Sequence, residues 1–133
     1  MNIFKGIIES VDTEGNLSVV RVQADNLQVT AIVVDTVVSA PFLIPGNDIN
    51  VHFKELEVVL ARNFSGQISF QNQWTGTITE IELGKLLASV TLKCGNNSIT
   101  SIITNRAATD MNLRPGDTVT AMVKTNEISL SPL

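Results

Sequence analysis

The sequence contains no tyrosine, one tryptophan, one cysteine and one histidine, and aromatic residues make up only 5% of it. The single cysteine, Cys94, cannot form a disulfide within the chain, and the single histidine, His52, cannot join a second histidine in a zinc site. The sequence also lacks the G-x-x-x-x-G-K-[ST] pattern of ATPases and the G-x-S-x-G pattern of hydrolases. We therefore expect a protein that is not an enzyme and that uses no cofactor.

Charge and hydropathy exclude further classes of partner. The chain has nine basic and 13 acidic residues, and its formal net charge of −4 repels the phosphate backbone of nucleic acids. No apolar run approaches the roughly 18 residues that a membrane-spanning helix needs. Residues 1–12 lack the basic and apolar regions of a signal peptide. We expect a cytoplasmic protein that binds neither nucleic acid nor a membrane.

An internal repeat organises the 133 residues. When the chain is shifted by 70 positions, residues 1–63 align with residues 71–133 without a gap, and 14 of the 63 pairs are identical. The identical pairs include Asn2/Asn72, Gly6/Gly76, Leu17/Leu87, Thr30/Thr100, Ile32/Ile102, Gly46/Gly116 and Lys54/Lys124. We interpret residues 1–63 and 71–133 as two copies of one domain, joined by an uncharged connector at residues 64–70.

Each copy is predicted to be a small β-barrel. Hydrophobic and polar residues alternate with a period of two, which is typical of half-buried strands, and Asn- and Gly-containing turns separate these runs. Thr104 is suited to cap a helix over residues 106–112. Five strands with a short helix between the third and fourth are typical of the OB fold. The fold class is therefore all-β with a short helix per repeat, in two tandem OB-type five-stranded barrels. The clearest predicted strands are Val20–Ala24, Val29–Val33, Val90–Cys94, Ile99–Ile103, Val119–Val123 and Ile128–Leu130.

Two lysines are the strongest candidates for chemistry. Lys54 and Lys124 each end a predicted strand and occupy the same position in both copies. A lysine at this position could bind an oxyanion, with hydroxyl groups such as that of Thr104 completing the site. A strand-end lysine that keeps its charged group in water explains the same pattern, so the residues alone leave both readings open.

Four segments of the second copy resemble the mop domain: residues 68–78, 99–104, 113–117 and 121–124. Mop domains occur in molbindins and in the molybdate-responsive transcription regulator, and the related TOBE domain occurs in molybdate transporter ATPases. Two copies in tandem resemble the di-mop form of molbindin. The resemblance implies OB-type barrels, assembly as a homo-oligomer, most simply a trimer, and molybdate or tungstate as ligands bound between subunits. It also implies storage, buffering or delivery of the oxyanion without catalysis.

The resemblance further implies which residues bind the oxyanion. The family lysine corresponds to Lys124 and Lys54, the threonine before the helix to Thr104, and the opening serine to Ser69. Gln71 stands where the family has arginine. The candidate oxyanion-binding residues are therefore Lys124, Thr104, Ser69, Gln71 and Lys54.

The first copy departs further from the family than the second. Val34 replaces the threonine, Glu55 replaces the small residue after the lysine, and Met1 stands where the arginine would be. Residues 1–63 carry a net charge of −4, whereas residues 71–133 are neutral. We expect sites around Lys124 to bind a dianion more tightly than sites around Lys54.

Two other functions fit parts of the sequence. The chain could be a degenerate mop module that acts as an accessory or sensor through protein–protein contacts, since the family arginine is absent from both copies. It could also be an oligonucleotide- or oligosaccharide-binding barrel, although five phenylalanines and one tryptophan offer few stacking platforms and the charge is negative.

Overall fold

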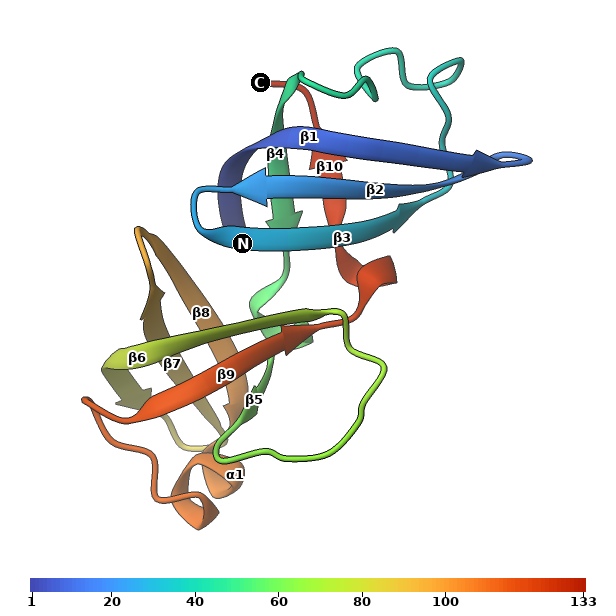
Figure 1. Cartoon of the computed structure of the whole chain (residues 1–133). Helices are drawn as coiled ribbons and strands as arrows, with labels where there is room; N and C mark the ends of the chain where they lie inside the picture. The colour runs from blue at the N-terminus through green and yellow to red at the C-terminus, as the bar shows by residue number, and fades with distance from the viewer.

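A computed structural model describes residues 1–133 and consists mainly of antiparallel strands (Figure 1). The first repeat contributes β1 to β5 and the second β6 to β10, and each repeat has a 3₁₀ turn before its last strand. The elements in chain order are β1 (Asn2–Glu14), β2 (Leu17–Ala24), β3 (Leu27–Val33), β4 (Asp48–Phe53), η1 (Glu55–Glu57), β5 (Val59–Ala61), β6 (Asn72–Leu83), β7 (Leu87–Cys94), β8 (Asn97–Thr104), α1 (Asn105–Asp110), β9 (Thr118–Val123), η2 (Thr125–Glu127) and β10 (Ser129–Ser131).

The strands form two five-stranded sheets that exchange their last strands. The first sheet has the order β10-β4-β1-β2-β3, and the second has the order β5-β9-β6-β7-β8. Strand β5 of the first repeat pairs with β9, and β10 of the second repeat pairs with β4. In Figure 1 the chain crosses from one sheet to the other after β4 and again after β9. Each OB-type unit is therefore completed by a strand from the other repeat.

A bulge and a Pro-Gly turn shape both sheets in the same way. The β1–β2 register shifts between Ile8 and Ser10, and the β6–β7 register shifts at the equivalent position. The backbone of Ile8 then bonds with the turn before β4: Gly46 N–H donates to Ile8 C=O at 2.7 Å. Gly116 and Ile78 repeat this bond at 2.8 Å. Both turn glycines have a positive φ, near 94° and 95°, which explains why glycine recurs there.

A second glycine pair is required by close packing. A Cβ on Gly6 would lie 2.5 Å from the Val22 side chain, and one on Gly76 would lie 2.4 Å from the Lys93 carbonyl oxygen. The curved first strand of each repeat therefore passes too close to its neighbour for any side chain.

Two equivalent asparagines join the repeats. The buried amide of Asn72 accepts from Thr30 N–H at 2.7 Å and donates to Thr30 C=O at 2.8 Å. Asn2 makes the same pair of bonds with the backbone of Thr100, both at 2.9 Å. β3 and β8 are the outermost strands of their sheets, so one side of each has no neighbouring strand. Each asparagine at the start of one repeat thus pairs with backbone N–H and C=O groups on the free side of the other repeat's third strand. This explains why Asn2/Asn72 and Thr30/Thr100 are identical pairs.

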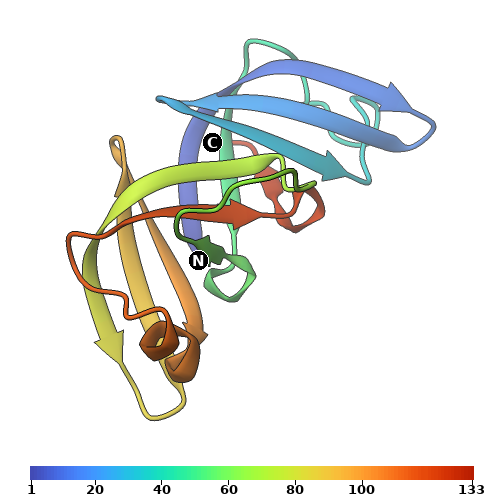
Figure 2. The same cartoon turned by 60° about the horizontal axis from the view of Figure 1, so that its bottom comes forward.

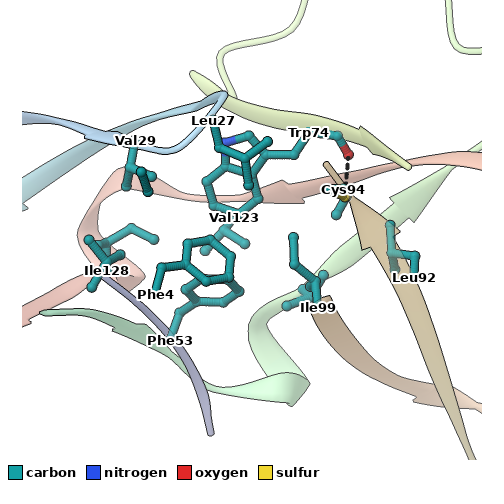
Figure 3. Packing of buried hydrophobic residues seen from close by; sticks show 14 of the residues in the cluster. Phe4, Leu27, Val29, Phe53, Trp74, Leu92, Cys94, Ile99, Val123 and Ile128 are labelled. Atoms are coloured by element: carbon teal, nitrogen blue, oxygen red, sulfur yellow. Dashed lines mark hydrogen bonds between the residues drawn. The ribbon is translucent and has the colours of Figure 1, made fainter. Parts of the chain in front are cut away.

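One hydrophobic core runs through both repeats. A single cluster of 28 buried residues contains side chains from all parts of the chain (Figure 3). At its centre, the rings of Phe4, Phe53 and Trp74 lie 5.4 to 5.9 Å apart. A single domain of about 60 residues buries too little apolar surface for high stability. The shared core and the exchanged strands overcome that limit. Figure 2 shows the two sheets next to each other from a second direction.

The helix expected in each repeat forms only in the second. There, Thr104 caps α1 and its hydroxyl oxygen accepts from Ala107 N–H at 3.0 Å, as the sequence predicted. The equivalent residues of the first repeat form turns instead. That segment contains the β-branched pair Val37 and Val38 and is followed by Pro41, which disfavour a helix. No helix of this structure has both the length and the apolar character needed to cross a bilayer.

Candidate functional site

The two candidate lysines occupy equivalent positions in the structure. Each directly follows its repeat's fourth strand and is the residue before a 3₁₀ turn, and both side chains are exposed. The backbone carbonyl of Lys54 accepts from Glu57 N–H, and that of Lys124 accepts from Glu127 N–H, both at 3.0 Å. The turn uses only backbone atoms of the lysines, so it leaves both ammonium groups available to a ligand.

Gln71 and Lys124 follow the last paired residues at one end of the β6–β9 ladder. The last residue pair of the β6–β9 ladder is Asn72 opposite Val123, so the residues just beyond it are Gln71 and Lys124. Both are exposed, and Ser69 lies two residues earlier in an exposed loop. The ladder thus places two of the five candidates, Lys124 and Gln71, at the same end of β6 and β9, with Ser69 in the loop that leads to Gln71. We call these three residues the Lys124 end.

Thr104 belongs to the opposite end of the molecule. The strand exchange packs η1, which follows Lys54, against β8, which ends at Thr104. Thr104 and Leu56 of η1 line one cavity of about 380 Å³, whose other residues are all apolar. Within one chain, Thr104 is therefore grouped with the Lys54 end and not with Lys124. The sequence suggested the opposite grouping because it treated each repeat as a closed unit.

The Lys54 end contains a carboxylate that is already ion-paired. The carboxylate of Glu55 lies 2.5 Å from the Met1 amino group, and this hydrogen bond with the N-terminal ammonium lowers the pKa of Glu55. At the Lys124 end the residue equivalent to Glu55 is the neutral Thr125. There η2 packs against β3. β3 is followed by the exposed Val34, which is the equivalent of Thr104. The Lys54 end therefore combines Lys54, Thr104 and the Glu55 carboxylate. The Lys124 end combines the lysine, the Gln71 amide and the hydroxyl groups of Ser69 and Thr125, with no carboxylate directly after the lysine.

Other candidate chemistry finds no support in the geometry. Cys94 is fully buried, its thiol is 3.9 Å from the Trp74 carbonyl oxygen, and burial raises its pKa to about 11. His52 forms a 2.6 Å hydrogen bond with Ser131 on the exchanged strand β10. Three or more His, Cys, Asp or Glu side chains do not gather anywhere as a potential metal site.

The structure also reveals a cavity that sequence reasoning missed. It has a volume of about 550 Å³ and lies between the β2–β3 hairpin of the first repeat and β6 of the second. Gln71 is the only candidate residue that lines it, and Arg21 lies on the opposite wall. Arg21 occupies an outward-facing strand position where the second repeat has Thr91, and that substitution was the only signal in the sequence.

Comparison with known proteins identifies the family. The TOBE domain model matches residues 68–130, which cover almost all of the second repeat. The chain is 30% identical over 118 residues to the molybdenum-pterin-binding protein MopA of Rhodobacter capsulatus. It is 31% identical over 126 residues to the molybdenum transport protein ModE of Herbaspirillum seropedicae. The second repeat therefore belongs to the TOBE-domain family.

Relatives in this family differ in length from the chain. The alignments cover 92% and 87% of this chain but only 47% of ModE and 44% of MopA, so the chain spans about half the length of these curated relatives.

A crystal structure of the cytoplasmic molybdate-binding protein ModG, with molybdate bound, superposes with a TM-score of 0.93. That alignment covers 99% of this chain and 96% of ModG at 26% identity. The tandem OB-type fold predicted from the sequence is therefore confirmed.

Proposed function

We propose that this protein binds molybdate or tungstate reversibly and without catalysis, and that it stores, buffers or delivers the oxyanion in the cytoplasm. The observation that carries the proposal is the match to molybdate-bound ModG over nearly the full length of both chains. The relatives MopA and ModE, whose names refer to molybdenum, support the same ligand.

The Lys124 end has the side chains that such a ligand requires. A tetrahedral dianion needs a positive charge and several hydrogen-bond donors, and charge-assisted hydrogen bonds are the strongest of these. Lys124 would supply the charge, Gln71 an amide N–H, and Ser69 a hydroxyl. Lys54 and Thr104 would form a weaker site at the other end, because a protein carboxylate, that of Glu55, is already the partner of the N-terminal ammonium there.

We further propose that the chain assembles into a homotrimer, so that sites are completed between subunits. Equivalent leucines are exposed on both repeats: Leu17 is 45% and Leu87 49% exposed. Ile32 is 40% exposed, and its equivalent, Ile102, is half-buried. Leu17 and Ile32 line a cavity on the first repeat, and Leu87 and Ile102 line one at the equivalent place on the second. Exposed apolar groups that recur in this way favour burial against other subunits.

Two measurements test this proposal. Calorimetry should detect saturable binding of molybdate and of tungstate, which has nearly the same size and charge. Sulfate should bind more weakly, because its shorter bonds leave its oxygens out of reach of some donors. Light scattering should give a mass of roughly 43 kDa, three times the 14.4 kDa chain. Absence of any molybdate binding would overturn the proposed ligand. A stable monomer at micromolar concentration would overturn the proposed homotrimer.

A degenerate module that acts through protein contacts is the second candidate. It is favoured by Glu55 beside Lys54 and by Gln71 in place of the family arginine. This candidate would gain support if the chain formed a trimer that bound neither molybdate nor tungstate.

A further inference from the structure

The cavity between the two repeats is polar and lacks acidic side chains. Nine residues line it, and only Leu27 and Trp74 are hydrophobic. None of the nine is aspartate or glutamate, although the chain as a whole has 13 acidic residues against nine basic ones. The nearest carboxylates, Asp12 beside Arg21 and Glu9 beside Gln28, do not line the cavity. A lining that holds a guanidinium and no carboxylate favours an anion.

Hydrogen-bond donors face this cavity from both repeats. Arg21 and Gln28 come from β2 and β3, and Gln71, Gln73 and Thr75 come from β6 or the residue before it. Gln71 makes no hydrogen bond within the chain, so both of its amide hydrogens are available. Gln28 and Gln73 each use their amide nitrogen once, on Glu9 and on the Phe70 carbonyl, which leaves one amide hydrogen on each.

The guanidinium of Arg21 is held only weakly by protein groups. Its sole ion pair is with Asp12, at 3.5 Å, and that carboxylate is 73% exposed. An exposed pair at this distance contributes little, so an anion in the cavity can compete for the guanidinium. Arginine presents paired N–H donors whose spacing matches two oxygens of one oxyanion.

The equivalent surface at the other end has different side chains. There, Thr91 replaces Arg21 and Ser98 replaces Gln28. Met1 and Ile3 stand at the positions of Gln71 and Gln73, so the guanidinium and all three glutamine amides are absent. The arrangement is thus confined to one of the two interfaces between repeats and does not follow from the fold alone.

We propose that this cavity is a separate binding site for a tetrahedral oxyanion, with Arg21 as its cation and Gln28, Gln73 and Thr75 as donors. This inference rests on the proposed oxyanion binding but uses neither candidate lysine. The cavity is several times larger than one such ion, so water molecules share it and bridge the ion to the more distant amides. A ligand here touches both sheets and stabilises their arrangement.

Trp74 provides a direct readout of this cavity. It is the only tryptophan, the chain has no tyrosine, and its indole N–H donates to the Gln28 carbonyl at 2.8 Å. We expect Trp74 emission to change saturably as molybdate is added to the wild-type protein. Arg21→Gln should weaken the affinity reported by Trp74 by about tenfold or more, because it removes a charged hydrogen bond. Asp12→Asn should strengthen it by about two- to fivefold, because it frees the guanidinium.

A matched control and an independent measurement separate the possible outcomes. Arg106→Gln removes the same charge from a side chain that is 90% exposed on α1, and it should leave the Trp74 titration unchanged. Equilibrium dialysis of the same samples counts all bound molybdate. Bound molybdate without a Trp74 response, or equal titrations for Arg21→Gln and Arg106→Gln, would overturn the cavity site and leave the proposed function standing. No bound molybdate at all would overturn both.

Discussion

The two interfaces between the repeats have the same backbone design and different chemistry. At both, an asparagine from the start of one repeat bonds to the third strand of the other, and a lysine precedes a 3₁₀ turn. At the Lys54 end, Glu55 places a carboxylate next to the lysine. At the Lys124 end, the neighbours are Thr125, Gln71 and a cavity that contains Arg21. Identities such as Asn2/Asn72 maintain the fold, and we propose that the differences between the repeats decide which end holds an anion.

The asparagine bridges should give the largest effects. Asn72 is completely buried and makes a third bond, to the Val123 carbonyl at 3.1 Å. Asn72→Ala leaves buried backbone groups of Thr30 without partners, so we expect a loss of about 2–4 kcal/mol in the free energy of unfolding. Asn2→Ala removes two bonds and should cost less. Urea unfolding measures both, with the exposed Asn126→Ala as control, and equal losses from all three would contradict the bridging role.

The close-packed glycines should affect both repeats to a similar extent. Gly6→Ala and Gly76→Ala each force a methyl group against a neighbouring strand, and we expect each to cost about 1–3 kcal/mol. Thermal unfolding of the two variants checks this symmetry. A clearly tolerated substitution in one repeat alone would mean that its first strand can shift, and that the two sheets are less alike than their registers indicate.

The lysines should break the symmetry in ligand binding. Lys124→Met removes the charge but keeps the apolar stem, so molybdate affinity should fall about 10- to 150-fold. Lys54→Met should have less effect, because the Glu55 carboxylate at that end competes with an anion for the cations there. Glu55→Thr, which copies Thr125 into the first repeat, should improve binding there. Calorimetric titration of the three variants tests this, and equal losses from both lysine variants would refute a specialised second repeat.

The smallest effect concerns Cys94, whose equivalent in the first repeat is Ala24. Burial raises the pKa of the Cys94 thiol to about 11, whereas an unfolded chain has a thiol pKa of roughly 8.5. The folded state therefore holds this proton more tightly, and its contribution to stability is lost as pH rises from about 8.5 toward 11. Unfolding measured across this pH range should show a shallower decline for Cys94→Ala than for wild type. Parallel declines would mean that the thiol does not titrate on unfolding.

The sequence predicted most of the local structure. Alternation of apolar and polar residues located β2, β3, β7, β8 and β9, and Thr104 marked the start of α1. It overestimated the helix content, because the repeat alignment suggested a helix in the first copy that Val37, Val38 and Pro41 disfavour. The alignment also marked the residues that hold the repeats together, although their partners were not visible in it.

The grouping of the candidate site residues could not be predicted in the same way. Lys124 and Gln71 meet because β6 and β9 pair within one repeat, which is what a closed barrel implies. Thr104 meets the segment after Lys54 because the fifth strands cross between sheets. Arg21 faces Gln71 only because the β2–β3 hairpin of one repeat packs beside β6 of the other.

The sequence by itself determined where strands and turns form, because side-chain alternation and the Pro-Gly turns act over a few residues. Tertiary structure alone decided which sheet each last strand joins. Strands β5 and β10 have three residues each, and the backbone hydrogen bonds that pair them are the same for any sequence. Their partners are fixed instead by burial of Val58 and Ile128 in the common core and by contacts such as Ser101 Oγ–H donating to the Val58 carbonyl at 2.8 Å. That choice placed Thr104 with the Lys54 end, and it placed Arg21 across the cavity from Gln71.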